Sequence, residues 1–159
     1  MINHIIANPI LYPVLEVAEL FFKIKDKILP IEASRYQPLM HYLIKSINVQ
    51  RDMGLRAADD WSIQNQSSCK CDNCKIAMDF LRSKTEVKKI WPLVTAGREH
   101  IFSVFSSLDV PVDLSEEKKG SPYKLVMVKN DRLHKEAKEK FERLNDYYNK
   151  FEIETVAAA

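Results

Sequence analysis

Glycine is scarce in this chain of 159 residues, which has only Gly54, Gly97 and Gly120. Neither G-x-G-x-x-G nor G-x-x-x-x-G-K can be formed, so the glycine-rich phosphate loops of common nucleotide enzymes are excluded. No apolar run approaches the roughly 20 residues of a membrane span. The N-terminal MINHIIANPILYPVLEV lacks the basic segment of a secretory signal. We therefore expect no membrane association, no small-molecule substrate and a location in the cytoplasm or nucleus.

Charge of one sign is also lacking, because the net charge is only +2. The composition, 46% hydrophobic and 29% charged, is typical of a folded protein. A chain of this length corresponds to about one domain. We predict a single domain, 1–159, made of a helical hairpin at 9–54, a linker at 55–68 and an α+β unit at 69–153.

The spacing of apolar residues along the chain predicts the positions of the helices and strands. The first helix begins near Val14 and stops at Pro30, and a second runs from about Tyr36 to Gly54, joined by LPIEA at 29–33. A short helix follows Cys74, capped by Asp72 or Asn73, and is expected to bury Ile76, Ala77, Phe80 and Leu81. Strands are predicted in 87–94, 110–115 and 123–129, a helix at 95–108 and a long polar helix from about 130 to 153. The fold class is thus α+β: a helical hairpin packed on a small three-stranded sheet with helices and a zinc-binding knuckle.

All three cysteines fall within six residues, in the C-x-C-x-x-C formed by Cys69, Cys71 and Cys74. An extended backbone sends the first two thiols to one side, and C-x-x-C spacing suits a tight turn, so three sulfurs can converge on a zinc ion at about 2.3 Å each. His100, in GREHIF, is the expected fourth ligand, with His134 as the second choice. Three ordinary reduced thiols are the alternative to a metal site.

A Cys3His site has all four positions taken by protein, and closed sites of this kind are structural. We therefore expect zinc to tie the linker and the helix after Cys74 to the helix that carries His100. Folding would then depend on the metal.

SCKCDNCK, a following F-L, REHI and KGSPYKLVMVK resemble a cysteine-containing C-terminal region of uncharacterised fungal and other microbial proteins. In some of those proteins the region lies downstream of a 2-oxoglutarate/Fe(II) dioxygenase-like domain. The resemblance extends back through DDWSI and the paired helices, and so covers most of the chain. It implies a metal-binding accessory module and carries no assigned activity.

Catalytic interpretations find little support in the motifs. The one H-x-E, at His134, lies in a polar helix where the glutamate points away, which excludes a dioxygenase iron site. Zinc deaminases place H-x-E before the cysteines and a proline before the first of them, and this chain does neither. A dithiol redox role for Cys71 and Cys74 stays open as an alternative, although C-x-x-C here follows a polar linker and not a strand. Cys–His nucleophilic catalysis lacks an orienting group.

Basic residues near the cysteines suggest a second alternative, a nucleic-acid-binding face with aromatic stacking. The candidate residues for this face are Lys88, Lys89, Trp91, Arg98, Lys118, Lys119, Lys124 and Lys129. Interleaved glutamates on the last helix favour the simpler interpretation of a solvated charged surface. The sequence thus predicts a zinc-stabilised protein-interaction or accessory module without catalytic activity.

Overall fold

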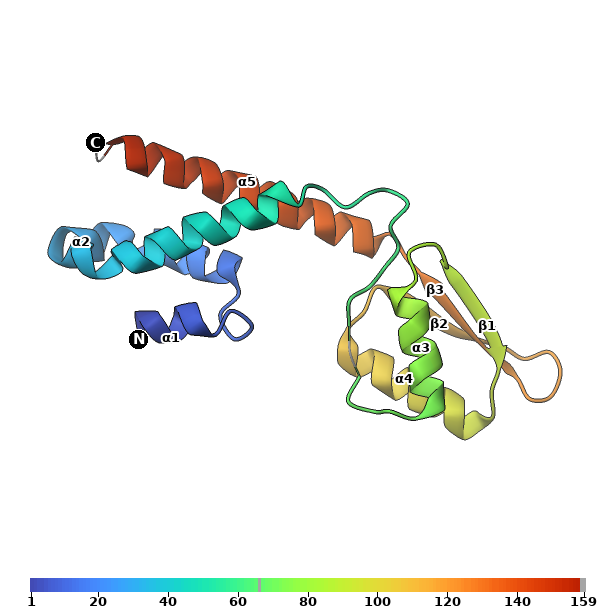
Figure 1. Ribbon diagram of the computed structural model, residues 1–159. Helices are drawn as coiled ribbons and strands as arrows, with labels where there is room; N and C mark the ends of the chain where they lie inside the picture. Colours follow the sequence, from blue (N-terminus) through green and yellow to red (C-terminus); the bar gives the residue numbers. More distant parts are fainter. Residues whose placement is uncertain (66, 158–159) are drawn as a thin grey trace. The chain divides into compact units, whose positions relative to one another are not determined.

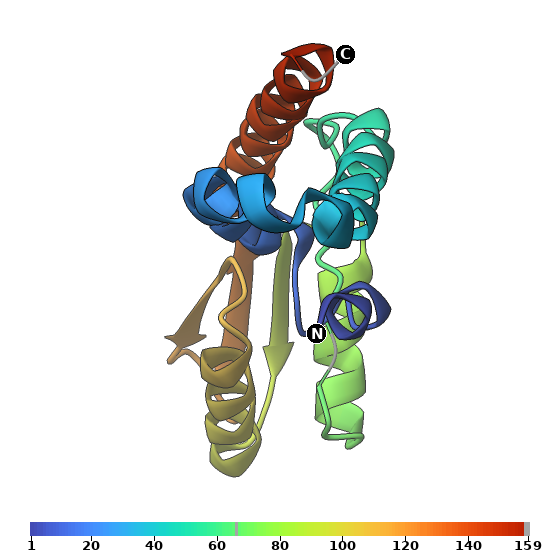
Figure 2. The ribbon, with the colours of Figure 1, turned by 90° about the vertical axis from the view of Figure 1, so that its left-hand side faces the viewer.

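The fold is α+β, as predicted, in a computed structural model that describes residues 1–65 and 67–157 and the side chains of all these except 28–33 and 154–157. Figures 1 and 2 show two views of the ribbon. The elements are α1 (Ile2–Ala7), α2 (Val14–Asp52), α3 (Asp72–Arg82), β1 (Lys88–Pro92), α4 (Thr95–Leu108), β2 (Val112–Glu117), β3 (Lys124–Lys129) and α5 (Arg132–Ala157).

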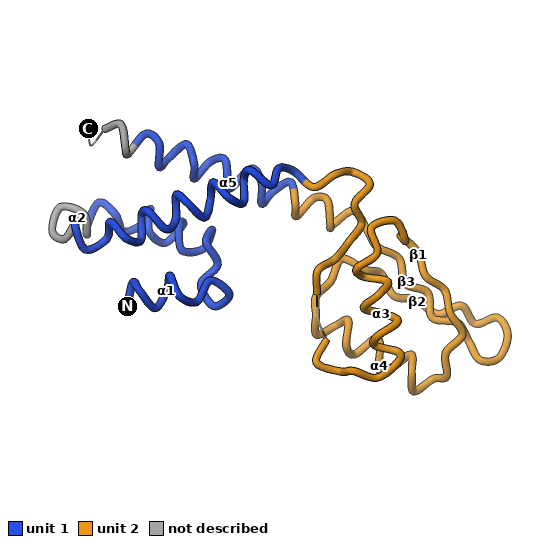
Figure 3. The backbone as a smooth tube through the Cα atoms, in the orientation of Figure 1, with its two compact units in different colours: residues 1–55, 138–159 blue, residues 56–137 orange. Residues whose placement is uncertain are grey.

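The chain divides into two compact units, coloured separately in Figure 3. Unit 1 comprises residues 1–55 and 138–159, and unit 2 comprises residues 56–137. Unit 2 is therefore inserted in the sequence of unit 1, and α5 contributes residues to both. The single domain, its boundaries at 9–54, 55–68 and 69–153, and the packing of the hairpin on the sheet stay predictions.

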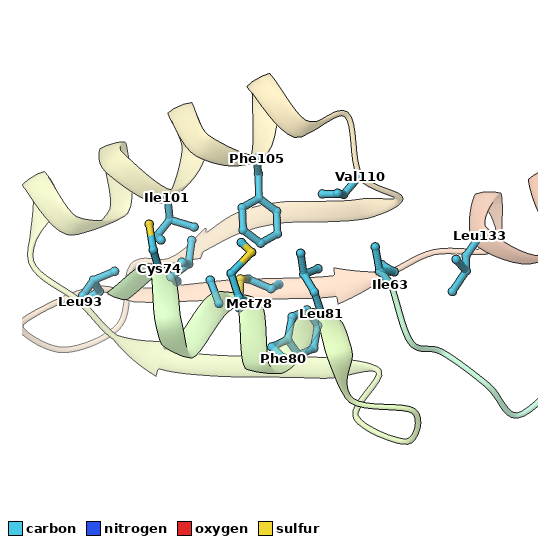
Figure 4. Close-up of a cluster of buried hydrophobic side chains, with 13 residues drawn as sticks. Ile63, Cys74, Met78, Phe80, Leu81, Leu93, Ile101, Phe105, Val110 and Leu133 are labelled. Atoms are coloured by element: carbon cyan, nitrogen blue, oxygen red, sulfur yellow. The ribbon is translucent and has the colours of Figure 1, made fainter. Parts of the chain in front are cut away.

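Unit 2 is built on a three-stranded antiparallel sheet of order β1-β3-β2. Side chains alternate across β3, so Leu125 and Met127 are buried while Val126 and Val128 lie on the opposite face. Both α3 and α4 cover the same face of the sheet (Figures 1 and 2). The core between them is shown in Figure 4 and consists of Ile63, Cys74, Ala77, Met78, Phe80, Leu81, Leu93, Ile101, Phe105, Val110, Leu125, Met127 and Leu133.

Unit 1 contains the predicted hairpin, although the structure assigns it to one element, α2, where the sequence predicts two helices. A straight helix would separate Leu15 from Ile47 by about 48 Å, yet both belong to one apolar cluster. The arms 14–27 and 34–52 accordingly lie side by side (Figures 1 and 2). The predicted joint at 29–33 lies outside the described side chains.

The second half of α5 completes this core. Its residues Leu144, Tyr147 and Phe151 are buried against the two arms of α2, and the Phe151 ring stacks on Phe21 with centroids 5.9 Å apart. The rest of the cluster comes from α2 and consists of Val14, Leu15, Ala18, Phe21, Leu39, Leu43 and Ile47. Among the described residues, no helix is both long and apolar enough to cross a bilayer.

Candidate metal centre

Three segments of unit 2 bring together the four residues that the sequence predicts as ligands. Cys69 and Cys71 lie just before α3, Cys74 lies in its first turn, and His100 lies on α4. Figure 4 shows Cys74 at the N-terminal end of α3, near Leu93 and Ile101. His134, the second choice for the fourth ligand, instead packs edge-on against Trp61, with ring centroids 4.6 Å apart.

The ligand atoms converge on the His100 imidazole. Its Nε2 lies 3.4 Å from Cys69 Sγ, 3.5 Å from Cys71 Sγ and 3.2 Å from Cys74 Sγ. All four atoms lie within 4.8 Å of one another. A tetrahedral zinc with bonds of about 2.3 Å to sulfur and 2.0–2.1 Å to nitrogen would place sulfur and nitrogen about 3.6 Å apart.

Hydrogen bonding alone does not account for this convergence. One imidazole nitrogen carries either one proton or one lone pair, and so serves one partner in the ring plane. Three sulfurs at similar distances from one nitrogen match the edges of a coordination tetrahedron instead. The Cys3His group can therefore hold a metal ion, and its donor set fits zinc.

The start of α3 shapes the cysteine segment. Cys71 is the N-cap, with extended backbone, and its Sγ accepts a hydrogen bond of 3.5 Å from the Cys74 amide. The prediction that Asp72 or Asn73 caps the helix is wrong, because both residues lie within α3 and Cys71 occupies the capping position. Asp72 instead forms an ion pair with Lys75 at 2.9 Å. A sulfur at this position also satisfies an amide that the helix leaves without a partner.

Burial and hydrogen bonding shift the pKa values of the Cys71 and Cys74 thiols in opposite directions. The Cys74 amide lowers the pKa of the exposed Cys71 thiol to about 7. Burial and, to a lesser extent, the neighbouring thiols of Cys71 and Cys69 together raise the pKa of the Cys74 thiol to about 12. A bound metal ion would hold even the buried thiol as a thiolate, because coordination to a cation deprotonates it outright.

Gly97 allows α4 to approach the cysteine segment. A Cβ at this position would lie 2.8 Å from Leu93 Cγ and 3.1 Å from Asn73 Nδ2. Asn73 directly precedes Cys74, and Gly97 lies about one turn before His100 on α4. The absence of a side chain therefore sets how closely the imidazole approaches the three sulfurs.

Gly97→Ala should weaken metal binding about tenfold to a hundredfold, since the added methyl overlaps Leu93 and Asn73 and displaces the turn of α4 that carries His100. Affinity is measured by competition with a chromophoric chelator, with Ser103→Ala on the exposed face of α4 as the control. An unobstructed Gly-to-Ala change in a helix raises stability by about 1 kcal/mol. Tighter metal binding and a higher melting temperature for Gly97→Ala would thus contradict the role of this close approach.

Arg98 anchors the same turn of α4 from inside unit 2. It is 4% exposed, and its Nε donates to Glu116 Oε1 on β2 at 2.8 Å. One terminal nitrogen donates to the Leu93 carbonyl and the other to Thr95 Oγ1 at 3.2 Å. The pattern of the sequence did not identify Gly97 or Arg98 as positioning residues, although a glycine inside a predicted helix is a signal of close packing.

The residues predicted for nucleic acid differ in burial and in their ion pairs, and that interface stays a prediction. Lys129 is 2% exposed, donates to the Ser83 carbonyl at 2.7 Å, and burial lowers its pKa to about 8. Lys89 pairs with Glu86 and Lys124 with Glu117, while Trp91 packs against the core. Exposed side chains remain at Lys88, Lys118 and Lys119.

Comparison with protein-family models, with curated proteins and with solved structures finds no match for this chain. The resemblance to the cysteine-containing microbial region therefore stays a prediction.

Proposed function

We propose that this protein is a zinc-stabilised interaction module in which Cys69, Cys71, Cys74 and His100 form a closed structural site. The observation that carries the proposal is the position of His100 Nε2, 3.2–3.5 Å from each of three sulfurs. Thiolate and imidazole donors in a tetrahedron favour zinc over the harder cations. Four protein ligands leave no coordination position for a substrate, which supports a structural role.

The site would fix the segment around Cys69 and the start of α3 to α4. The Cys69 amide donates to Ser67 Oγ at 3.1 Å, a contact inside the same segment that does not reach α4. A bound metal would join the cysteine segment, the start of α3 and α4 through four coordination bonds. We infer that the chain has no catalytic activity of its own and acts by presenting a surface to a protein partner.

Metal content of the purified, tag-free protein tests this function. We expect one zinc per chain by elemental analysis and, after cobalt(II) exchange, the absorption of a tetrahedral cobalt–thiolate centre. His100→Ala should lose the stoichiometric metal, whereas His134→Gln should keep it. A protein that contains no metal and has three freely titrating thiols would refute the zinc site and leave the dithiol redox alternative for Cys71 and Cys74.

A further inference from the structure

Unit 1 has a groove that the metal site does not use. Apolar side chains line it from the turn before α2 and from both arms of that helix, among them Pro13, Leu15 and Val49. Its volume is about 800 Å³. Val49 is 51% exposed, and Ile10 and Leu11 beside the lining residue Pro9 are also exposed. The groove therefore has an apolar floor that continues onto exposed apolar surface.

The rim of the groove is basic. Lys45 on α2 and Lys140 and Arg143 on α5 line it, against a single carboxylate, Glu16. Arg143 is held near Glu16 and Glu19, at 3.9 and 3.4 Å. Lys45 and Lys140, in contrast, make no ion pair with any other residue that the structure describes. Two cations without carboxylate partners thus flank an apolar floor.

We propose that this groove binds an acidic amphipathic helix of a partner protein. Helical walls with an apolar floor accept the apolar face of a helix, a recurring mode of peptide recognition. The excess of positive charge on the rim selects carboxylates beside that face, because complementary charge speeds encounter and excludes wrong partners. An apolar centre with a polar rim is also the usual anatomy of a protein interface. This inference names the kind of partner for the interaction role proposed above and rests on that role.

A pair of synthetic peptides of about four helical turns tests the proposal. Both carry leucine on one face; one has glutamate at the flanking positions and the other has lysine. By fluorescence anisotropy, the acidic peptide should bind the metal-loaded full chain at least about tenfold tighter than the basic peptide, and salt should weaken its binding. Equal affinity of the two peptides would overturn the proposal.

Variants locate the binding on the protein. Lys45→Glu with Lys140→Glu should lose at least about tenfold in affinity for the acidic peptide and should gain affinity for the basic one. Lys118→Glu with Lys138→Glu changes the net charge equally at exposed positions that do not line the groove, and should leave the peptide preference unchanged. Val49→Asp should abolish binding, whereas Leu20→Asp, at a site 58% exposed on the same helix, should not. Unchanged binding by Val49→Asp would refute the groove as the site.

Two further measurements distinguish a partner helix from a second copy of this chain, and this proposal from that of the zinc site. If sedimentation shows that the free protein is a dimer and that Val49→Asp is a monomer, the proposal is overturned. The groove would then be assigned to a second copy of this chain. Zinc content is measured on the same samples. Failure of the peptide to bind a protein that retains zinc overturns this inference alone, whereas absence of zinc from the purified wild type refutes the structural site.

Discussion

Treatment of the metal-loaded protein with a chelator should unfold unit 2 and leave unit 1 folded. All four candidate ligands lie in unit 2, and Cys74 is itself a fully buried member of its core. One core rarely supplies more than about 3–5 kcal/mol in a unit of roughly 80 residues. Structural zinc in small sites supplies about 10–16 kcal/mol at pH 7, so the metal is expected to dominate the stability of unit 2.

Amide NMR spectra resolve the two units in one sample. Dispersed signals from Ile101 and Met127 in unit 2 should collapse with chelator and return with added zinc. Signals from Leu43 and Leu144 serve as the internal control, because the core of unit 1 contains no ligand. Cys74→Ser should reproduce the chelated spectrum. A unit 2 that keeps its dispersed signals without metal would show that its apolar core suffices.

Replacement of Arg98 by methionine should lower the free energy of unfolding by about 2–4 kcal/mol, even in the presence of excess zinc. The change removes three hydrogen bonds from a side chain that is 4% exposed and leaves Glu116 without its cation. Urea unfolding followed by fluorescence measures the loss. Lys89→Met is the matched control, since its pair with Glu86 is more exposed and should contribute less than about 1 kcal/mol. Equal losses in the two variants would contradict the burial argument.

The grouping of the three cysteines with His100 was predictable because the spacing of the cysteines is local. Three cysteines within six residues restrict the backbone so strongly that only the fourth partner had to be chosen, and His100 lies within the same α+β unit. The helix at 95–108 was also predicted at its true bounds, because Pro92 precedes it and apolar residues follow its period.

Other features depend on tertiary packing and left no local signal. Ile76 was expected to be buried and is 39% exposed, while Met78, two positions later, takes the core position. Burial of Arg98 and Lys129 is unexpected for residue types that are normally solvated. The contribution of Leu144 and Phe151 to the core of unit 1 joins segments about a hundred residues apart, which periodicity within one helix does not reveal.

The insertion of unit 2 in the sequence of unit 1 affects the order in which the two units can fold during synthesis. A ribosome completes residues 56–137 before it makes Leu144, Tyr147 and Phe151, which the core of unit 1 requires. Unit 2 can therefore fold while both arms of α2 still lack their cover. In most proteins the N-terminal part folds first. Here the apolar faces around Phe21 and Leu43 stay uncovered until the second half of α5 is made, so a pause in translation near residue 137 would extend the time for which they are exposed.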